Sequence, residues 1–496
     1  MTPMTASPLE HPSPPLVGNL AEHLGHIGKS LDGFLSDPPG DAVGRRADWT
    51  AAINRSFPAV GVGAETVVAE LADVLIPNGT RLAEPGFWGW ITTAPSTVPV
   101  VAATAAAVAA PQRYMITAFN LLEELSLEWL ADLCGLAPTM KGVYSSGGSV
   151  ANLVALGAAR QYAFEQRGID VAVVGTGAVL TAVYASGETH HTIQRAAGVL
   201  GIGRANVRLV PTDDQLRMRP DALTEMLAAD LAAGVVPIAV VATAGTTNTG
   251  SIDPIRALGE IARAHGVWFH VDGAYGLPGI LDERVAPSYD GLELADSAIV
   301  DPHKWLNAPV GVAATFVRDR SILQRAFTQE PAAYLESVST GDEEHVAVSL
   351  AAMGVPYADM AVELSAPSRG VIVWSILREL GREGVAARVR SDNDHARQLA
   401  QLAREHPRLE LLIEPELSIC CFRYRTEGVA DLDALNADLM LRLHVETPYL
   451  PSSTRVKGVF ALRPCFINPR TGPEMIDAFA ETVVRIGDEL AAARSA

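Results

Sequence analysis

The chain has 496 residues, of which 48% are apolar and 19% are charged, and its formal net charge is −19. This composition excludes a disordered chain, and the acidic balance argues against a nucleic-acid-binding surface, which needs clustered Lys and Arg. At about 150 residues per domain, the length favours three domains or one large core with appendages. Four cysteines are too few for a disulfide framework and lack the CxxC spacing of a zinc site, so the cytoplasm is the expected compartment.

The N-terminal stretch, residues 1–115, predicts an arm that packs on another body. Its first 60 residues alternate Pro and Gly clusters with short amphipathic stretches. The first 16 residues have neither a basic cluster nor an apolar run, which is unlike a secretory signal. Residues 98–110 are Ala-rich and contain Pro99 and Thr104. Because roughly 20 apolar residues are needed to span a bilayer, this segment predicts a packing helix.

The middle of the chain alternates apolar, β-rich runs with helical segments. The predicted strands are 171–175, 179–184, 238–242, 267–271 and 298–300, and the predicted helices are 149–166, 221–233 and 255–265. This alternation predicts βαβ units and a parallel sheet that is buried on both faces. Ligands of such sheets bind beyond the carboxyl ends of the strands.

After about residue 375 the pattern changes to long charged helices with short strands between them. The helices are predicted at 392–405 and 473–493, and the strands at 418–424 and 458–463. This region predicts a smaller α+β domain.

A Ser- and Gly-rich turn, Ser145-Ser146-Gly147-Gly148-Ser149, comes directly before the helix predicted at 149–166. Glycines let the backbone approach an anion, and the first turn of a helix offers free N–H groups and the positive end of its dipole. The turn therefore predicts an anion cradle. A plain loop with a Ser N-cap is an equally common explanation of this pattern.

Three further candidate groups follow predicted strands. Asp272 follows the strand predicted at 267–271, Lys304 follows Val300 by four residues, and the pair His190-His191 follows the strand predicted at 179–184. A Lys beside an aromatic residue and away from charge runs is a candidate for amine nucleophile chemistry, although a lone Lys is more often a surface residue. A metal site of His190, His191, His270 and Asp272 matches no particular zinc or iron spacing. The glycine-rich stretch 198–203 follows no clear strand, which disfavours dinucleotide binding.

An anion cradle, a Lys, a carboxylate and a His at one sheet edge are the set that pyridoxal phosphate requires. The phosphate needs the cradle, and the aldehyde carbon needs a Lys for a Schiff base. The pyridine nitrogen needs a carboxylate that keeps it protonated, and the ring face needs a stacking partner.

Several motifs then carry a specific resemblance. They are SSGGSVANLVAL (145–156), ATAGTTNTGSIDP (242–254), HVDGAYG (270–276), DPHKWLN (301–307) and ALRPCFINPRT (461–471). With these motifs the chain resembles the group II pyridoxal-phosphate amino acid decarboxylases, the family of the aromatic L-amino acid and glutamate decarboxylases. The resemblance implies an α/β, fold-type I enzyme with a mostly parallel sheet and helices on both faces. It divides the chain into an N-terminal arm (1–115), a large cofactor domain (116–375) and a small C-terminal α+β domain (376–496).

The resemblance also implies a role for each matching residue. Lys304 would form the Schiff base, Asp272 would pair with the pyridine nitrogen, and His190 would stack on the ring. The remaining cofactor contacts would be Ala274 on the other ring face, Gly148, Ser149 and His303 at the phosphate, and Thr247 near the Asp272 side. The arm implies a homodimer with its sites at the interface.

The reaction is less constrained, because fold-type I enzymes include aminotransferases and aldehyde-forming oxidases. Tyr334 matches the mobile-loop tyrosine with which the family completes protonation after CO2 leaves, so decarboxylation to an amine is favoured. A decarboxylating aldehyde synthase or an aminotransferase is the alternative.

Candidate pocket residues for an aromatic or bulky apolar side chain are Phe87, Trp88, Trp90 and Phe119, although the first three also suit packing of the arm on the core. Asp301 stands where some relatives have Asn.

Overall fold

The computed structural model describes residues 19–37, 46–53, 57–113, 118–328, 355 and 357–495. The chain divides into two units, Met1–Glu84 and Pro85–Ala496. The first unit contains helices α1 (Leu20–Ser36), α2 (Arg46–Ala52) and α3 (Ala64–Glu70), and none of the three has a buried residue. The Ser30 hydroxyl donates to the Ala72 carbonyl at 2.7 Å and so ties α1 to the turn that follows α3.

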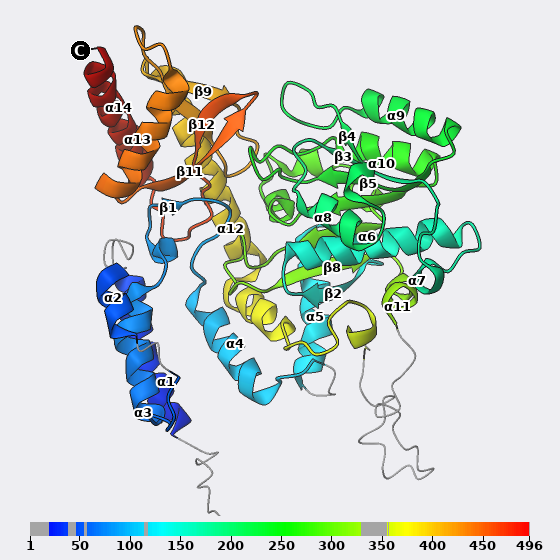
Figure 1. Cartoon of the computed structure of the whole chain (residues 1–496), viewed down its shortest axis with the longest axis horizontal. Coiled ribbons are helices and arrows are strands. Elements are labelled where there is room, and N and C mark those ends of the chain that lie inside the picture. The colour runs from blue at the N-terminus through cyan, green and yellow to red at the C-terminus, as the bar shows by residue number, and fades with distance from the viewer. Residues whose placement is uncertain are drawn as a thin grey trace, which may run out of the picture. The chain divides into compact units, whose positions relative to one another are not determined.

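A seven-stranded sheet forms the centre of the second unit (Figure 1), with strand order β2-β8-β7-β6-β5-β3-β4. The strands are β2 (Lys141–Ser145), β3 (Thr181–Ser186), β4 (Val207–Val210), β5 (Val236–Thr243), β6 (Trp268–Asp272), β7 (Ser297–Val300) and β8 (Ala313–Val317). Pairs are parallel from β7 through β6, β5 and β3 to β4, whereas β8 runs antiparallel to both of its neighbours. The predicted α/β architecture is thus confirmed, with one reversed strand.

Helices cover both faces of this sheet. They include α6 (Gly148–Glu165), α8 (Thr192–Val199), α9 (Pro220–Ala232), α10 (Ile255–Ala264) and α11 (Ser321–Phe327). Right-handed crossovers place α6 and α8 on one face and α9 and α10 on the other, and each pair is in contact. Helix α6 packs across β5 to β8, and its many Ala and Gly residues permit this close approach. It therefore carries its N-terminus over the carboxyl ends of the parallel strands.

The strand predicted at 171–175 is wrong, because Val171–Val174 form the short helix α7. The side chain of Asp170 accepts a hydrogen bond from the Ala172 N–H at 3.2 Å and caps this turn. Gly175 ends it with a φ of 73°. An N-cap and a terminal glycine therefore outweigh the apolar, β-branched composition of the run.

The C-terminal sheet has the order β1-β11-β12-β10-β9. Its strands are β1 (Phe87–Trp88), β9 (Leu409–Ile413), β10 (Cys421–Tyr424), β11 (Leu450–Val456) and β12 (Val459–Arg463). Only β1 pairs in parallel, with β11, and it comes from the segment that directly follows the first unit. The predicted boundaries at 115 and 375 stay predictions, but residues 87–88 complete a sheet whose other strands lie beyond residue 400.

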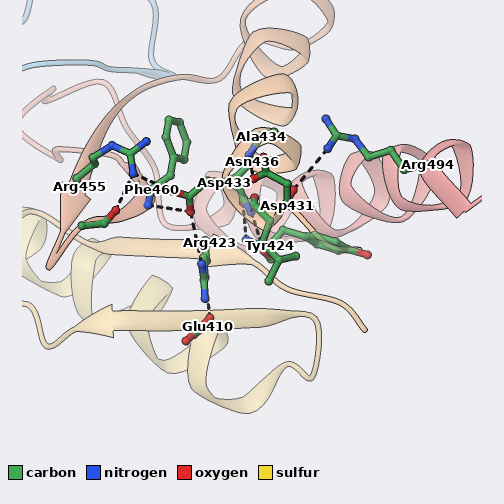
Figure 2. Close-up of polar contacts among 12 residues, drawn as sticks. Glu410, Arg423, Tyr424, Asp431, Asp433, Ala434, Asn436, Arg455, Phe460 and Arg494 are labelled. Atoms are coloured by element: carbon green, nitrogen blue, oxygen red, sulfur yellow. Dashed lines mark hydrogen bonds and ion pairs between the residues drawn. The ribbon is translucent and has the colours of Figure 1, made fainter. Parts of the chain in front are cut away.

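Helices α13 (Leu432–Glu446) and α14 (Glu474–Ser495) pack beside this sheet. Figure 2 shows how polar contacts attach α13: the Asp433 carboxylate contacts Arg455 at 2.8 Å and Arg423 at 3.7 Å, and accepts from the Phe460 N–H at 3.2 Å. The Asn436 side chain bonds both the N–H and the carbonyl of Tyr424, each at 2.8 Å. The helix is thereby held to β10 and β12.

One long helix, α12 (Gly370–Glu405), contributes to both cores of this unit (Figure 1). Its backbone leaves helical geometry at Gly381, with a φ of 63°. It packs on α4 (Thr97–Ala109) and α5 (Ala118–Leu133) and also on α14 and β9. The packing helix predicted at 98–110 is observed as α4. In the part of the chain that the structure describes, no helix combines the length and apolar character that crossing a membrane requires.

Candidate active site

A pocket of about 410 Å³ opens at the carboxyl ends of the parallel strands. Its lining includes residues that follow β2, β3, β5, β6 and β7 in the chain. These are Ser146, Gly147, Gly148, Ser149, Val150, Asn152, His190, Thr192, Thr243, Gly245, Thr247, Asp272, Ala274, Tyr275, Asp301, His303, Lys304 and Val310. The topology therefore brings the four predicted groups to one place, as expected for ligand sites of such sheets.

The turn before α6 forms one wall of the pocket. Gly147 has a φ of 149°, and a Cβ atom on Gly148 would lie 2.6 Å from Asp301 Oδ2, so neither position accepts a side chain without strain. The backbone thus lies open to a ligand at the first turn of an 18-residue helix. His303 lines the same wall, and its Nδ1 donates to the Val312 carbonyl at 2.6 Å. This arrangement suits an anion, as the N-terminal turn of a helix often does.

Lys304 lies in the turn that follows β7. Its Nζ atom lies 3.1 Å from Asp301 Oδ2, and its backbone N–H donates to the Asp301 carbonyl at 2.9 Å. The next residue, Trp305, is buried, stacks on Tyr275 and donates from Nε1 to Asp392 on α12 at 2.7 Å. The contacts of Trp305 hold the turn that contains Lys304 in place. The Lys304 side chain itself is partly exposed in the pocket.

Asp272 is the last residue of β6 and is 4% exposed. Its carboxylate accepts from Asn152 Nδ2 at 3.0 Å and from the Ala274 N–H at 3.2 Å. None of the ion pairs within the described ranges includes this carboxylate. Because a buried charge is stable only when it is paired or hydrogen-bonded, Asp272 suits a ligand that brings its own positive charge.

His190 lines the pocket and is half-buried, four residues beyond the end of β3. Its Nδ1 atom lies 2.8 Å from Thr192 Oγ1, and its ring centroid lies 4.2 Å from that of His191. Burial lowers the pKa of His190, and nearby His191 and Lys304 lower it further, while Asp272 and Asp301 oppose the shift. The imidazole is therefore neutral at physiological pH.

The structure brings together every predicted cofactor-binding residue. Gly148, Ser149, His190, Thr247, Asp272, Ala274, His303 and Lys304 all line the pocket. Tyr334 lies outside the described residues, and the roles of all these side chains stay predictions.

The four residues predicted for the substrate pocket are not among the described residues that line this cavity. Trp88 is fully buried in the C-terminal core, where it stacks on Tyr449. Trp90 is 68% exposed and Phe87 lies beside it, with ring centroids 6.0 Å apart. Phe119 packs on the core of the large domain. For Trp88 the packing alternative holds, because its indole is enclosed by other aromatic rings.

Asn152, which lies within the motif 145–156, and Thr192 are pocket residues that were assigned no role from the sequence. Both are buried and polar, and Asn152 lies one helical turn after Gly148 on α6. A lone amide on the Ala- and Leu-rich buried face of a helix is the signal that points to such a residue.

Comparison with known proteins identifies the family. Residues 48–425 match the model of the pyridoxal-dependent decarboxylase conserved domain. The chain belongs to this decarboxylase family. It is 32% identical over 361 residues to an aromatic-L-amino-acid decarboxylase of Bacillus atrophaeus, covering 71% of this chain and 70% of that protein.

Two further similarities bear on the chemistry of this pyridoxal-dependent decarboxylase. A crystal structure of Oryza sativa TDC with pyridoxal phosphate (PLP) and tryptamine superposes with a TM-score of 0.84 and 26% identity, covering 96% of this chain and 99% of that one. A phenylacetaldehyde synthase of Arabidopsis thaliana is 31% identical over 311 residues, which is 61% of this chain and 60% of that protein. The expected activity, PLP-dependent decarboxylation of an amino acid, is thereby confirmed, and so is the cofactor.

The residues of the pocket fit this cofactor. The turn before α6 suits a phosphate, and the Lys304 amine suits an aldehyde carbon. The uncompensated carboxylate of Asp272 suits a protonated pyridine nitrogen. Gly147 and Gly148 have no side chains, so their backbone N–H groups are accessible at the turn.

Proposed function

We propose that this decarboxylase converts an aromatic L-amino acid into its amine and CO2, with Lys304, Asp272 and His190 as its principal site residues. The observation that carries the assignment is the convergence of a Lys, a buried carboxylate without a cation and a turn that suits an anion in one pocket. The aromatic substrate class is supported by the relatives, since the Bacillus atrophaeus protein is an aromatic-L-amino-acid decarboxylase and the Oryza sativa structure holds tryptamine.

Each residue then has a distinct task. When bound, PLP supplies an electron sink for the electron pair that CO2 leaves on the substrate. Lys304 would hold the cofactor covalently, and the first turn of α6, with Ser149 and His303, would bind its phosphate. Asp272 would hold the proton on the pyridine nitrogen by a charge-assisted hydrogen bond in a buried, low-dielectric site. His190 would cover one ring face, and Ala274 the other.

The cofactor assignment is tested by reduction with borohydride. The purified holoenzyme should be yellow, and reduction should attach the cofactor irreversibly to the peptide that contains Lys304, as detected by mass spectrometry. Lys304→Ala should abolish this attachment. Lys141→Ala is the matched control, because Lys141 is a partly exposed lysine paired with Glu128 at 2.7 Å outside the pocket. Attachment at another lysine in the Lys304→Ala variant would refute the assignment.

The substrate class is tested by a screen of amino acids with the holoenzyme, following CO2 and amine by mass spectrometry. Turnover of tryptophan, tyrosine, phenylalanine or related aromatic substrates, at rates well above those for glutamate, is expected. A preference for glutamate or another acidic amino acid would refute the aromatic assignment and leave the decarboxylase chemistry intact.

An aldehyde synthase is the second candidate, because one similar protein is a phenylacetaldehyde synthase. In the amine-forming reaction an acid must protonate Cα after CO2 leaves, and Tyr334 is the residue that we propose for this step. If dioxygen intercepts the reaction instead, the products are an aldehyde, ammonia and hydrogen peroxide. Product analysis with and without oxygen separates the two: an oxygen-independent amine supports the decarboxylase, and aldehyde with peroxide supports the synthase.

We also infer a cytoplasmic homodimer. Apolar side chains lie exposed on α4, where Val101 and Val108 are each 64% exposed, and at the pocket, where Val310 is 73% exposed. Large apolar side chains exposed on a helix and at the pocket suit contact with a second chain. All four cysteines are free and buried, which suits a reducing compartment. Light scattering of the purified holoenzyme should give twice the chain mass of 52.4 kDa, and a monomeric mass would refute the dimer.

A further inference from the structure

A continuous chain of buried hydrogen bonds runs behind the pocket. Trp268 Nε1 lies 2.8 Å from Ser297 Oγ, and Ser297 Oγ lies 2.8 Å from His270 Nδ1. The other ring nitrogen of the same histidine, Nε2, lies 2.9 Å from Asn152 Oδ1. His270 and Ser297 are fully buried. The chain thus reaches the back of the pocket without contact with solvent.

Asn152 divides this chain into two branches. Its Nδ2 atom lies 3.0 Å from Asp272 Oδ2 and 3.1 Å from Thr192 Oγ1, so both amide protons have an acceptor. Thr192 Oγ1 in turn lies 2.8 Å from His190 Nδ1. The Asn152 amide therefore connects Asp272, through Thr192, with His190. These are two of the groups that we propose to contact the cofactor ring.

The donors and acceptors in the chain can be ordered from its two fixed ends. An indole nitrogen can only donate, and an ionised carboxylate can only accept. Because the Asp272 carboxylate needs a donor, the Asn152 amide must direct its nitrogen toward Asp272 and its oxygen toward His270. His270 then donates from Nε2 and accepts at Nδ1 from the Ser297 hydroxyl, whose oxygen accepts from Trp268. Burial lowers the pKa of His270 to about 4, so its ring carries this single proton.

The same ordering extends to His190. Thr192 Oγ1 accepts from Asn152, so its own hydroxyl proton is free to donate to His190 Nδ1. A hydroxyl oxygen can accept twice, but within the described residues the Thr192 hydroxyl proton has no other acceptor than His190 Nδ1, so the neutral His190 ring carries its proton on Nε2. Within the described residues this Nε2 atom has no hydrogen-bond partner from the protein, and the ring lines the pocket. His190 therefore presents a free N–H.

We propose that Asn152 is a positioning residue that couples the Asp272 carboxylate, through Thr192, to the tautomer of His190. The hydrogen bond to the Asp272 carboxylate fixes the orientation of the amide, and His190 then offers Nε2–H to an acceptor in the pocket. The inference rests on the proposed function of Asp272 and His190 as partners of the cofactor.

The first test measures the tautomer directly, by nitrogen NMR of holoenzyme labelled at its histidine side chains, without substrate and at neutral pH. The His190 resonances are assigned from a His190→Gln spectrum. Wild-type His190 should show a protonated Nε2 and an unprotonated Nδ1. A proton on Nδ1 would overturn the proposal. Because this readout needs no turnover, a wrong tautomer would refute the coupling alone, whereas failed borohydride attachment at Lys304 would refute the proposed function.

The second test breaks the chain at two points. Asn152→Leu removes the amide. Thr192→Val removes only the hydroxyl and keeps the shape of the side chain, so this second variant still tests the proposal if Asn152→Leu does not fold. Both should give a mixture of His190 tautomers and lower kcat by about tenfold, the value of one lost hydrogen bond, with KM changed less than kcat. The pH at which the visible cofactor band changes should move in Asn152→Leu and stay in Thr192→Val, because only the former loses a donor to Asp272.

Asn436→Leu is the matched control. Asn436 is also a fully buried asparagine that bonds through its side chain, but it lies in the C-terminal domain and bonds the Tyr424 backbone. It should lower stability without a change in the His190 tautomer or in the pH response of the cofactor band. An unchanged His190 tautomer in both pocket variants, or an equal change in the control, would show that Asn152 only supports the fold.

Discussion

Asp301 is 2% exposed, and its Oδ2 atom lies 3.1 Å from Lys304 Nζ. Its Oδ1 atom has no hydrogen-bond partner in the described part of the protein. The same side chain lies against Gly148, at the turn that we propose to bind a phosphate. A carboxylate at this position opposes an anion, and the Lys304 ammonium partly compensates it.

The change Asp301→Asn should therefore tighten binding of the cofactor. Pyridoxamine 5′-phosphate is the suitable probe, because it has no aldehyde to react with Lys304. Removal of a like charge is worth roughly 1 kcal/mol, so the Kd measured by fluorescence titration should fall about fivefold. Asp296→Asn is the control, since its carboxylate bonds the Phe269 N–H outside the pocket. Weaker binding by Asp301→Asn would show instead that the carboxylate orders the turn.

Among single residues, the sequence predicts the chemically reactive side chains better than the residues that hydrogen-bond to them. Lys304 and Asp272 stand in motifs with a family pattern, His190 follows a predicted strand, and the structure places all three in one pocket. Asn152 bonds to Asp272 and to Thr192 through contacts that span 120 and 40 residues along the chain, and Thr192 in turn bonds to His190. No local pattern encodes such distances, so these partners become visible only when the sheet and α6 are assembled.

Helix α12 places a carboxyl group under the active-site turn. Asp392 is buried and accepts from Trp305 Nε1 at 2.7 Å. Burial raises its pKa from 3.8 to about 8, against the opposing effects of the Trp305 hydrogen bond and Arg388. The folded protein therefore keeps a proton that the unfolded chain releases above about pH 4, and this contribution to stability is lost as the pH rises through about 8.

Asp392→Asn should remove this pH dependence, because the amide oxygen still accepts from Trp305 without any charge. The free energy of unfolding of the wild type should fall relative to the variant between about pH 4 and pH 8, by up to about 1.4 kcal/mol per pH unit. Urea unfolding at several pH values measures the difference, and the effects of all other titrating groups cancel in it. Parallel pH curves for the two proteins would contradict the raised pKa of Asp392.

Strands are predictable from the sequence where a continuous apolar run marks them. Strands β5, β6 and β7 are continuous apolar runs buried on both faces, and the sequence predicts each of them. Strand β8 shows the same burial but runs antiparallel, and direction is decided by the chain path and not by composition. The two-residue strand β1 has no periodicity at all, so only its partner β11 defines it.

The C-terminal domain depends on one side chain from the opposite end of this unit. Trp88 is fully buried, with Tyr449, Phe466 and Phe479 around it at ring centroid distances of 5.4, 5.1 and 5.1 Å. Its Nε1 donates to Thr471 Oγ1 at 2.9 Å. The core that α13, α14 and the C-terminal sheet enclose is therefore incomplete without the segment that precedes α4.

Trp88→Ala should reduce the free energy of unfolding by about 3–5 kcal/mol, because it leaves a cavity the size of an indole ring among three aromatic rings. Trp90→Ala is the control in the same segment: its ring is 68% exposed, so the loss should stay within about 0.5 kcal/mol. Denaturant unfolding monitored by circular dichroism measures both. Equal effects of the two substitutions would contradict the placement of Trp88 in this core.

The pairing of β1 with β11 also sets an order of events during synthesis. The hydrogen bond between Trp88 and Thr471 joins residues that are 383 positions apart. At about 5–20 residues per second, a ribosome needs roughly 20–80 s to make the intervening chain. During that interval the indole has been made but its partners have not, while the strands of the large sheet are already emerging. Strand β11, which is made late, must therefore pair with β1, which is made early. A nascent chain that stalls before residue 450 leaves β1 unpaired and accessible to chaperones or to other chains.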